Sequence, residues 1–304
     1  MEKKSDVDAV FIDYLNEYRD KSLDELASIL GISRATLYRR LGLLKKNGLV
    51  KKYGIKTWCI GYGVSIWFLL PLGVGINTNI MLSNGILRDT IDSVYVTYSP
   101  SRTIIVKHFY RNEEECMLIN EAYTKLLSDY FEPIESISTN HIIIPRLYYG
   151  SKKVCIEVGN YNCPRLEFDG IDTIIVDGLI RGIDTINEIS NRYHISVSTV
   201  RYHYREHVKR IIYTKVYVLR KQVNVIGEFV TNNIESLLKM LNILYANGTI
   251  DYIDSIYLIN TTNPVVAYVE MHGNVINLLR DVEELFNVGL IDDAKIYSVF
   301  GRSY

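Results

Sequence analysis

Apolar residues recur every three to four positions through much of the first fifty residues, the spacing of an α-helix. The stretch 10–18 places its apolar side chains on one face of a helix, and polar residues fill the other positions. Ser22-Leu23-Asp24-Glu25 has the spacing of a capping box and predicts a second, short helix that ends at a glycine, Gly31. A third helix is expected over 34–46 and a strand over 50–56. A short helix, a tight turn and a capped helix followed by a strand are typical of a winged helix-turn-helix.

The pattern then changes to alternating strands and helices. Toward the C-terminus we expect a strand, a helix, two strands, a helix and a last strand, over 223–230, 234–245, 253–258, 264–271, 275–286 and 294–300. The same order is predicted earlier, over 64–70, 79–90, 93–98, 103–110, 113–130 and 134–141. This βαββαβ order predicts a ferredoxin-like unit, in which two helices cover one face of an antiparallel sheet.

Both modules recur in the same order. The hexapeptide at 91–96 (IDSVYV) returns at 253–258 (IDSIYL), and the start of the third helix at 32–37 returns at 195–200. The sequence therefore predicts an α+β protein made of two copies of a winged helix-turn-helix and a ferredoxin-like domain. The expected domains are 1–56, 57–145, 172–221 and 222–304, with a connector over 146–171. Whether the two sheet domains pair within one chain or between chains stays open.

One uncharged run and four cysteines bear on the location of the chain. The 19 residues of 58–76 carry no charge and approach the length of a membrane helix, but their glycines and Pro71 favour a buried strand. We expect no membrane association and a cytoplasmic protein. The four cysteines form no CxxC pair, so reduced thiols are expected, with a Cys155–Cys163 disulfide as the alternative.

Positive charge is concentrated in the first module. From Ser33 to Lys56 there are eight basic residues and no acidic one, although the whole chain has a formal charge of -1. A solvated face usually mixes both signs, so this cluster favours contact with the phosphates of double-stranded DNA. The DNA-binding residues predicted in this copy are Arg34, Ala35, Thr36, Tyr38, Arg39, Arg40, Lys45, Lys46, Lys51 and Lys52.

The second copy repeats this design with different residues. Its capping box lies at 185–188, and its predicted DNA-binding residues are Ser198, Thr199, Arg201, Tyr202, Arg205, Lys209 and Arg210. Val197 and Arg201 replace Arg34 and Tyr38, so the two helices should read different base patterns. His203 and His207 have a spacing that can hold a metal ion, but the sequence shows no third ligand, and no metal site is predicted.

The chain resembles the Lrp/AsnC (feast/famine, leucine-responsive regulatory protein) family of prokaryotic and archaeal transcription regulators. The resemblance rests on 22–33, on 39–50 with the basic strand after it, and on the βαββαβ module. It implies a transcription regulator whose sheet domains dimerise and sometimes sense an amino acid, here as a covalent pseudo-dimer. A homo-oligomer and an amino-acid effector at the sheet domains are thus expected partners. The family's Gly-Asp turn is replaced at 99–102 and 261–264, which argues against effector binding at that turn.

Two other functions remain open from the sequence. Siroheme decarboxylases resemble this family and use the sheet domain as a catalytic pocket, which needs convergent polar side chains. The candidates for such a pocket are His108, His141, Arg102 and Arg111 in the first copy, and His272 and Arg280 in the second. A sequence-tolerant architectural DNA-binding protein is the other alternative. Because no phosphate-binding loop, nucleophile elbow or HExxH motif is present, the prediction is a regulator without enzymatic activity, catalytic residues or cofactor.

Overall fold

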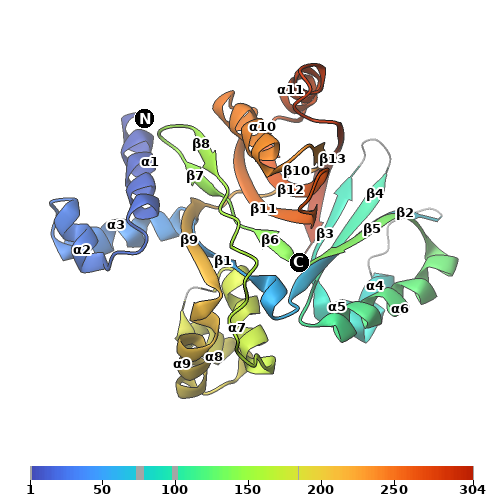
Figure 1. Ribbon diagram of the computed structural model, residues 1–304, viewed down its shortest axis with the longest axis horizontal. Helices are drawn as coiled ribbons and strands as arrows, with labels where there is room; N and C mark the ends of the chain where they lie inside the picture. Colours follow the sequence, from blue (N-terminus) through green and yellow to red (C-terminus); the bar gives the residue numbers. More distant parts are fainter. Residues whose placement is uncertain (1, 73–78, 98–101, 184, 304) are drawn as a thin grey trace.

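A nine-stranded antiparallel sheet forms the centre of the computed structural model, which describes residues 2–72, 79–97, 102–183 and 185–303 (Figure 1). The strand order is β5-β2-β4-β3-β13-β10-β12-β11-β6. The strands are β2 (Gly63–Pro71), β3 (Ile91–Thr97), β4 (Thr103–Tyr110), β5 (Phe131–Thr139), β6 (His141–Ile143), β10 (Val225–Thr231), β11 (Ile250–Asn260), β12 (Val265–Gly273) and β13 (Asp293–Ser303).

The helices between these strands complete two βαββαβ units, so the predicted α+β class and element order are confirmed. They are α4 (Asn79–Ser83), α5 (Gly85–Thr90) and α6 (Glu113–Tyr130) in the first unit, and α10 (Ile234–Ala246) and α11 (Val275–Asn287) in the second. The predicted helix over 79–90 is broken at Asn84, whose side-chain oxygen accepts the amides of Ile86 and Leu87 and so caps α5.

The uncharged run contains a buried strand, as predicted. Residues 63–71 form β2 and residues 57–59 a short 3-10 helix, whereas 73–78 lie outside the described residues. Among the residues that the structure describes, no helix is long and apolar enough to span a membrane.

The two sheet units pair within one chain. β3 of the first unit pairs with β13 of the second, which joins both into one sheet. At the other end, β5 leads through Asn140 into β6, and β6 pairs with β11. The sheet therefore curls until its two ends meet, and side chains of both units face each other across its inner side.

A three-helix bundle followed by a strand precedes each sheet unit. The first comprises α1 (Glu2–Glu17), α2 (Leu23–Ile29), α3 (Arg34–Lys46) and β1 (Leu49–Ile55), and the second α7 (Gly170–Ile180), α8 (Ile186–Tyr193), α9 (Val197–Glu206) and β9 (Ile212–Leu219). Both predicted capping boxes are present, at Ser22 with Glu25 and at Thr185 with Glu188. Gly31 has the expected positive φ of 61°, and His194 adopts nearly the same conformation at the corresponding turn, with φ 54°.

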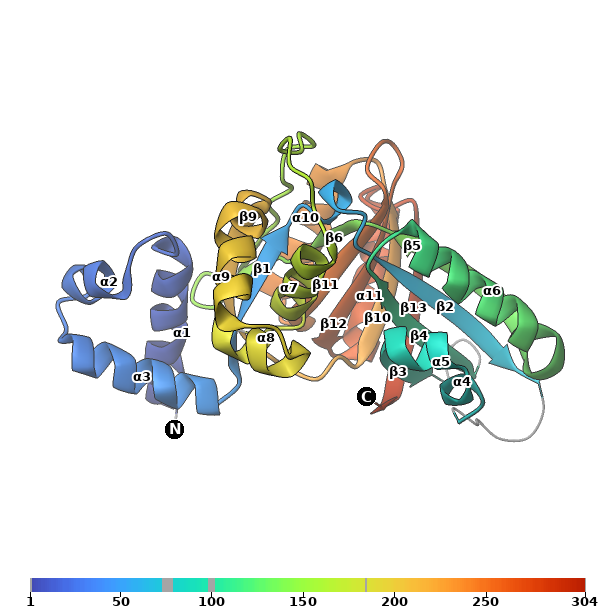
Figure 2. The same ribbon diagram turned by 90° about the horizontal axis from the view of Figure 1, so that it is seen from below.

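The strands after the two bundles pair with each other rather than forming separate wings. β1 and β9 make an antiparallel two-stranded sheet, with Leu49 opposite Leu219. The bundles also cross over, because α1 packs against β9 and α7 against β1. As Figure 2 shows, the first bundle lies at one end of the molecule, whereas the second lies beside the central sheet.

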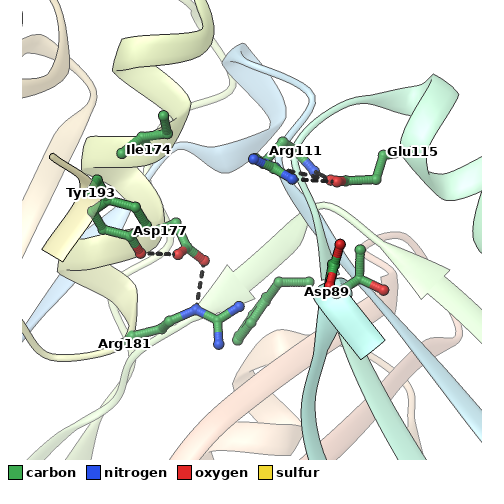
Figure 3. A pocket seen from close by; sticks show the side chains of 9 residues that line it. Asp89, Arg111, Glu115, Ile174, Asp177, Arg181 and Tyr193 are labelled. Atoms are coloured by element: carbon green, nitrogen blue, oxygen red, sulfur yellow. Dashed lines mark hydrogen bonds and ion pairs between the residues drawn. The ribbon is translucent and has the colours of Figure 1, made fainter. Parts of the chain in front are cut away.

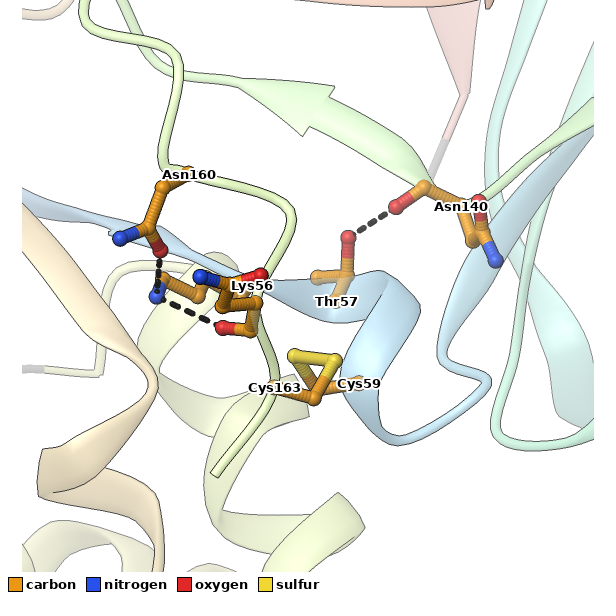
Figure 4. Close-up of a disulfide and its surroundings, with 7 residues drawn as sticks. Lys56, Thr57, Cys59, Asn140, Asn160 and Cys163 are labelled. Atoms are coloured by element: carbon orange, nitrogen blue, oxygen red, sulfur yellow. Dashed lines mark hydrogen bonds between the residues drawn. A yellow bond between two sulfur atoms is a disulfide. The ribbon is translucent and has the colours of Figure 1, made fainter. Parts of the chain in front are cut away.

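The connector contains a hairpin and a disulfide. β7 (Arg146–Tyr148) pairs with β8 (Lys153–Cys155), and Cys59 is bonded to Cys163 with their Cα atoms 5.4 Å apart (Figure 4). The prediction of four reduced thiols is therefore wrong, as is the alternative pairing with Cys155, because Cys155 is free. Spacing along the sequence could not bring out a pair that is 104 residues apart. The disulfide fastens the connector beside the end of β1.

Candidate active site

The predicted DNA-binding residues of the first bundle lie on and after α3. The Ser33 hydroxyl accepts the amide of Thr36 and starts the helix, while Leu37 and Leu44 are buried against the rest of the bundle. The side chains of Arg34, Ala35, Tyr38, Arg39, Lys45 and Lys46 are exposed, and those of Thr36, Arg40 and Lys51 are partly buried. These residues could contact a partner at the surface.

Lys52 departs from this pattern. Its side chain is 7% exposed, and its ammonium group lies 2.8 Å from the Asp254 carboxylate of β11. Burial lowers the pKa of Lys52, and the carboxylate of Asp254 partly offsets that effect. Lys52 therefore lies in the interior between the two halves of the chain, each made of one bundle and one sheet unit, and is not available to bind a phosphate.

The second bundle presents its predicted residues in the same way. The Ser196 hydroxyl caps α9 by accepting the amide of Thr199, which is partly buried. The remaining predicted residues, Ser198, Arg201, Tyr202, Arg205, Lys209 and Arg210, are exposed. Arg205 and Arg210 both pair with Glu206, so part of this positive charge is neutralised locally.

The residues named for an enzymatic pocket do not converge. His108 is buried under the helices of the first unit, 2.7 Å from the Tyr123 hydroxyl, and burial lowers its pKa to about 3. His141 stacks on Trp58, and His272 lies 2.8 Å from the Asp251 carboxylate. Arg280 pairs with the neighbouring Asp281, and Arg102 follows residues 98–101, which lie outside the described residues. Of these candidates, Arg111 lines a cavity.

A different set of residues surrounds a cavity of about 240 Å³ where the two bundles and both sheet units meet. The cavity is lined by β1, β3, β4, the end of α7, α8, the residue after β9, and β11. Five cationic side chains and two carboxylates contribute to its wall: Lys52, Lys107, Arg181, Arg192 and Arg220, with Asp92 and Asp254. We call this the central pocket. Arg192 and Arg220 are exposed in this wall, and their positive charge suits an anionic ligand.

The two carboxylates of the central pocket come from the repeated hexapeptide. Asp92 lies 3.2 Å from the Lys107 ammonium and 3.2 Å from the Arg181 guanidinium. Asp254 holds the corresponding place in the second copy and pairs with Lys52. Burial alone would raise the pKa of Asp254, but the positive charges of Lys52 and Lys107 outweigh it and hold that pKa below its usual range. Asp254 therefore stays ionised and balances one of the five cations.

Lys107 is also paired across the inner side of the sheet. Its ammonium group lies 2.8 Å from both carboxylate oxygens of Glu270 and 3.0 Å from the Tyr257 hydroxyl. Tyr257 and Tyr95 each donate a hydrogen bond to Glu270. Burial alone would lower the pKa of Lys107, but the Glu270 carboxylate and the surrounding groups raise it well above its usual value. Lys107 therefore remains charged.

Lys107 and Glu270 occupy equivalent positions of the two copies, 163 residues apart. Tyr95 and Tyr257 are likewise equivalent, at the offset of the hexapeptide. Equivalent residues that touch must lie at the approximate two-fold axis between the halves. The axis of this pseudo-dimer therefore passes through a buried ion pair of unlike residues.

A smaller cavity of about 110 Å³ adjoins the central pocket and shares Phe109 and Arg181 with it (Figure 3). The Arg181 guanidinium donates to Asp177 at 2.7 Å, and Asp177 also accepts the hydroxyl of Tyr62 at 2.7 Å. Burial alone would lower the pKa of Arg181, but Asp177 and Asp92 raise it. Arg181 is thus fixed between two carboxylates and connects the two cavities.

Sequence reasoning missed the central pocket because its residues come from distant segments. One signal was available: each copy of the hexapeptide carries an aspartate inside an apolar strand pattern, at positions 92 and 254. The structure also assembles a second polar cluster, Asp172 with His203 and His207, whose ligand atoms could hold a metal ion.

No family model matches the chain, and no curated protein matches it. Its fold is similar to that of a solved siroheme decarboxylase, NirDL, with a TM-score of 0.52, 12% identity, and coverage of 92% of this chain and 85% of that one. The same enzyme in complex with an iron-uroporphyrin III analogue gives a TM-score of 0.51 at 11% identity, with the same coverage. PH0061 aligns with 43% of this chain and 88% of its own, at a TM-score of 0.30 and 22% identity.

These comparisons correct one prediction. A protein without enzymatic activity was expected, but the fold over 92% of the chain is similar to that of an enzyme, a siroheme decarboxylase. The absence of familiar catalytic motifs misled the prediction, because a pocket assembled from seven segments leaves no local motif. The similarity in fold agrees with the resemblance to the Lrp/AsnC family and does not by itself establish membership.

Proposed function

We propose that this chain is an enzyme that binds a substrate with several carboxylate groups in the central pocket and removes one of these groups as carbon dioxide. The observation that carries the proposal is the convergence of five cationic side chains on one cavity, where Arg192 and Arg220 are exposed while Lys52, Lys107 and Arg181 are paired with carboxylates of the protein. Arg192 of α8 and Arg220 after β9 would bind separate carboxylates of one substrate. Charged hydrogen bonds of this kind are the strong ones.

The structural neighbours support this choice of substrate class. The similar fold belongs to a siroheme decarboxylase that was solved with an iron-uroporphyrin III analogue. Uroporphyrins are macrocycles that carry carboxylate side chains on their rim. The central pocket, at about 240 Å³, is smaller than the roughly 300–1,000 Å³ of a typical ligand pocket. It therefore fits one carboxylate arm of a larger molecule, with the ring at its opening.

The chemistry requires a proton donor beside the bound arm. When the bond to the carboxylate carbon breaks, its electron pair remains on the substrate carbon, which then takes up a proton. Tyr257 lines the pocket, and its hydroxyl is hydrogen-bonded to Lys107 and Glu270. Burial, followed by the Glu270 charge, raises the pKa of Tyr257, so it stays protonated until a strongly basic carbon forms. We assign Tyr257 as the donor and Lys107 as the group that positions it.

Titration with iron-uroporphyrin III tests the proposal. Binding should shift the visible absorption band of the porphyrin, and mass spectrometry should detect products that have lost carbon dioxide. Arg192→Ala and Arg220→Ala remove exposed cations from the pocket wall and should weaken binding by about tenfold each, the effect of about 1.4 kcal/mol. Arg205→Ala, on α9 and outside the pocket, is the matched control. Unchanged absorption and no loss of carbon dioxide in the wild type would reject the proposal.

A second candidate function is sequence-specific DNA binding by a Lrp/AsnC-like transcription regulator. The observation in its favour is that α3 and α9 each begin at a serine cap and expose basic side chains along their length. Such helices can enter the major groove. Because Arg34 and Tyr38 are replaced by Val197 and Arg201, we propose an asymmetric site. Selection of bound duplexes from a random pool tests this, and a perfect palindrome would argue against it.

A further inference from the structure

Two histidines of α9 and one aspartate of α7 face each other inside the second bundle. His203 and His207 are one helical turn apart, and Asp172 lies in the first turn of α7. We propose that these three side chains form a binding site for a divalent transition-metal ion of the zinc type. The sequence showed the histidine pair, but the third ligand is 31 residues away from the first histidine and becomes visible only in the fold.

The three ligand atoms have the spacing that a metal ion requires. The Nδ1 atoms of His203 and His207 each lie 3.1 Å from the same carboxylate oxygen of Asp172, and the three ligand atoms all lie within 4.8 Å of one another. In a tetrahedral site with bonds of about 2.0 Å, neighbouring ligand atoms are about 3.3 Å apart. A small opening of the cluster would therefore place all three atoms in the first coordination shell.

The surroundings of the cluster favour a bound ion over three solvated side chains. Asp172 is fully buried, and the side chains of His203 and His207 are only 12% and 21% exposed. The ring of Phe168 packs beside His207 and the ring of Tyr202 beside His203, so aromatic groups restrict access of water. Two imidazoles and one carboxylate are nitrogen and oxygen ligands suited to zinc. The Asp169 carboxylate, 3.6 Å from His203, or a water molecule could supply the fourth.

The first copy shows that this bundle does not need such a cluster. At an offset of 163 residues, Ala9 stands in place of Asp172, Arg40 in place of His203 and Leu44 in place of His207. There Arg40 closes the interface by pairing with Asp8 at 3.3 Å and lying over the Phe11 ring. The same helix contact is thus made in one copy by an ion pair with aromatic packing and in the other by three metal-type ligands.

A bound ion would fasten α9 to α7. The ion would fix the orientation of α9 relative to α7, whose end forms part of the central pocket wall. Because the ion binds the folded bundle and not the unfolded chain, it should also stabilise the protein.

Metal titration of the full chain tests the site. Zn²⁺ measured by calorimetry should bind with one equivalent, and Co²⁺ should give visible bands of a tetrahedral nitrogen and oxygen site without a thiolate charge-transfer band, which excludes the free Cys116 and Cys155. His203→Ala should weaken binding by at least about 100-fold. His272→Ala, which removes a histidine that pairs with Asp251 elsewhere, should bind as the wild type does.

A second variant separates metal binding from folding. His207→Gln keeps a hydrogen-bond donor toward Asp172 but has a poor metal ligand, so its circular dichroism should match the wild type while its zinc affinity falls. Zinc should raise the melting temperature of the wild type and leave that of His207→Gln unchanged. If the wild type binds zinc no more tightly than His203→Ala and His207→Gln, the cluster is only a hydrogen-bonded contact and the proposal fails.

Discussion

Replacing Lys107 by methionine would leave a buried charge at the two-fold axis of the pseudo-dimer. Methionine keeps most of the volume of the lysine stem but removes its ammonium group. Asp92 would still be paired with Arg181 at 3.2 Å. Glu270, 3% exposed, would keep only the hydroxyls of Tyr95 and Tyr257. The loss therefore falls on Glu270.

The expected loss of stability is large. Breaking a buried ion pair by removing one partner typically costs about 3–5 kcal/mol, because the other charge stays buried without compensation. The Lys107 ammonium lies 2.8 Å from both oxygens of Glu270. Both residues are buried, so solvent does not weaken the attraction between their charges. We therefore expect the free energy of unfolding to fall by about 3–5 kcal/mol. Because the raised pKa of Lys107 keeps it charged, the effect should persist throughout the neutral range.

Urea unfolding followed by circular dichroism measures this loss as a shift of the midpoint at constant slope. Lys239→Met, on the exposed side of α10, is the control and should change the free energy of unfolding by less than about 0.5 kcal/mol. The double variant Lys107→Met with Glu270→Gln should recover much of the stability, since no unpaired charge remains. The ion pair does not hold the halves together if Lys107→Met lowers the free energy of unfolding by less than about 1 kcal/mol. The same conclusion follows if the loss in the double variant equals the sum of the losses in the two single variants.

Three further predictions concern acid, the disulfide and DNA. Because the pKa of His108 is about 3 in the folded protein and 6.5 is its ordinary value, the unfolded chain alone takes up this proton as the pH falls from 6.5 toward 3. This group should therefore lower the free energy of unfolding by about 1.4 kcal/mol for each pH unit of that fall. His108→Gln should flatten the curve of unfolding free energy against pH. An unchanged slope in that variant would contradict the prediction. Cys163→Ser should lower the free energy of unfolding by about 2–5 kcal/mol, because it removes the disulfide. Cys116→Ser, which replaces a free cysteine, should lower it by far less. Four reactive thiols in the native, unreduced protein would argue against the disulfide. If α3 reads DNA, Arg39→Ala should change the sequence preference in binding assays. Lys51→Ala should weaken binding to all sequences evenly and reduce its salt dependence. Equal effects of both variants on every sequence would count against recognition by α3.

Local rules in the sequence predicted most of the elements. The capping boxes at Ser22 and Thr185 act through residues only three positions away, so sequence alone is sufficient to place the start of α2 and α8. The break at Asn84 was less visible, because a cap inside an apolar pattern competes with continuation of the helix. Alternation and turn residues likewise located both βαββαβ units.

Partners across long distances could not be predicted in this way. Lys52 looked like a surface residue among other lysines, and only the pairing of β1 with β9 turns it inward to Asp254. The sequence did not single out Asp172, and only the packing of α7 on α9 brings it to the histidines. The same applies to Cys59 and Cys163. Each of these contacts depends on how helices and strands pack, which a single sequence without alignment does not specify.

The unlike pair at the two-fold axis has an evolutionary consequence. A homodimer of two first halves would bring two Lys107 ammonium groups together, and a homodimer of two second halves would bring two Glu270 carboxylates together. Both arrangements would bury like charges, which disfavours self-association of either half as a separate subunit. The chain also assembles its site at any dilution, because its two halves are always joined. Because the two halves meet in one chain, each half can carry features that the other lacks.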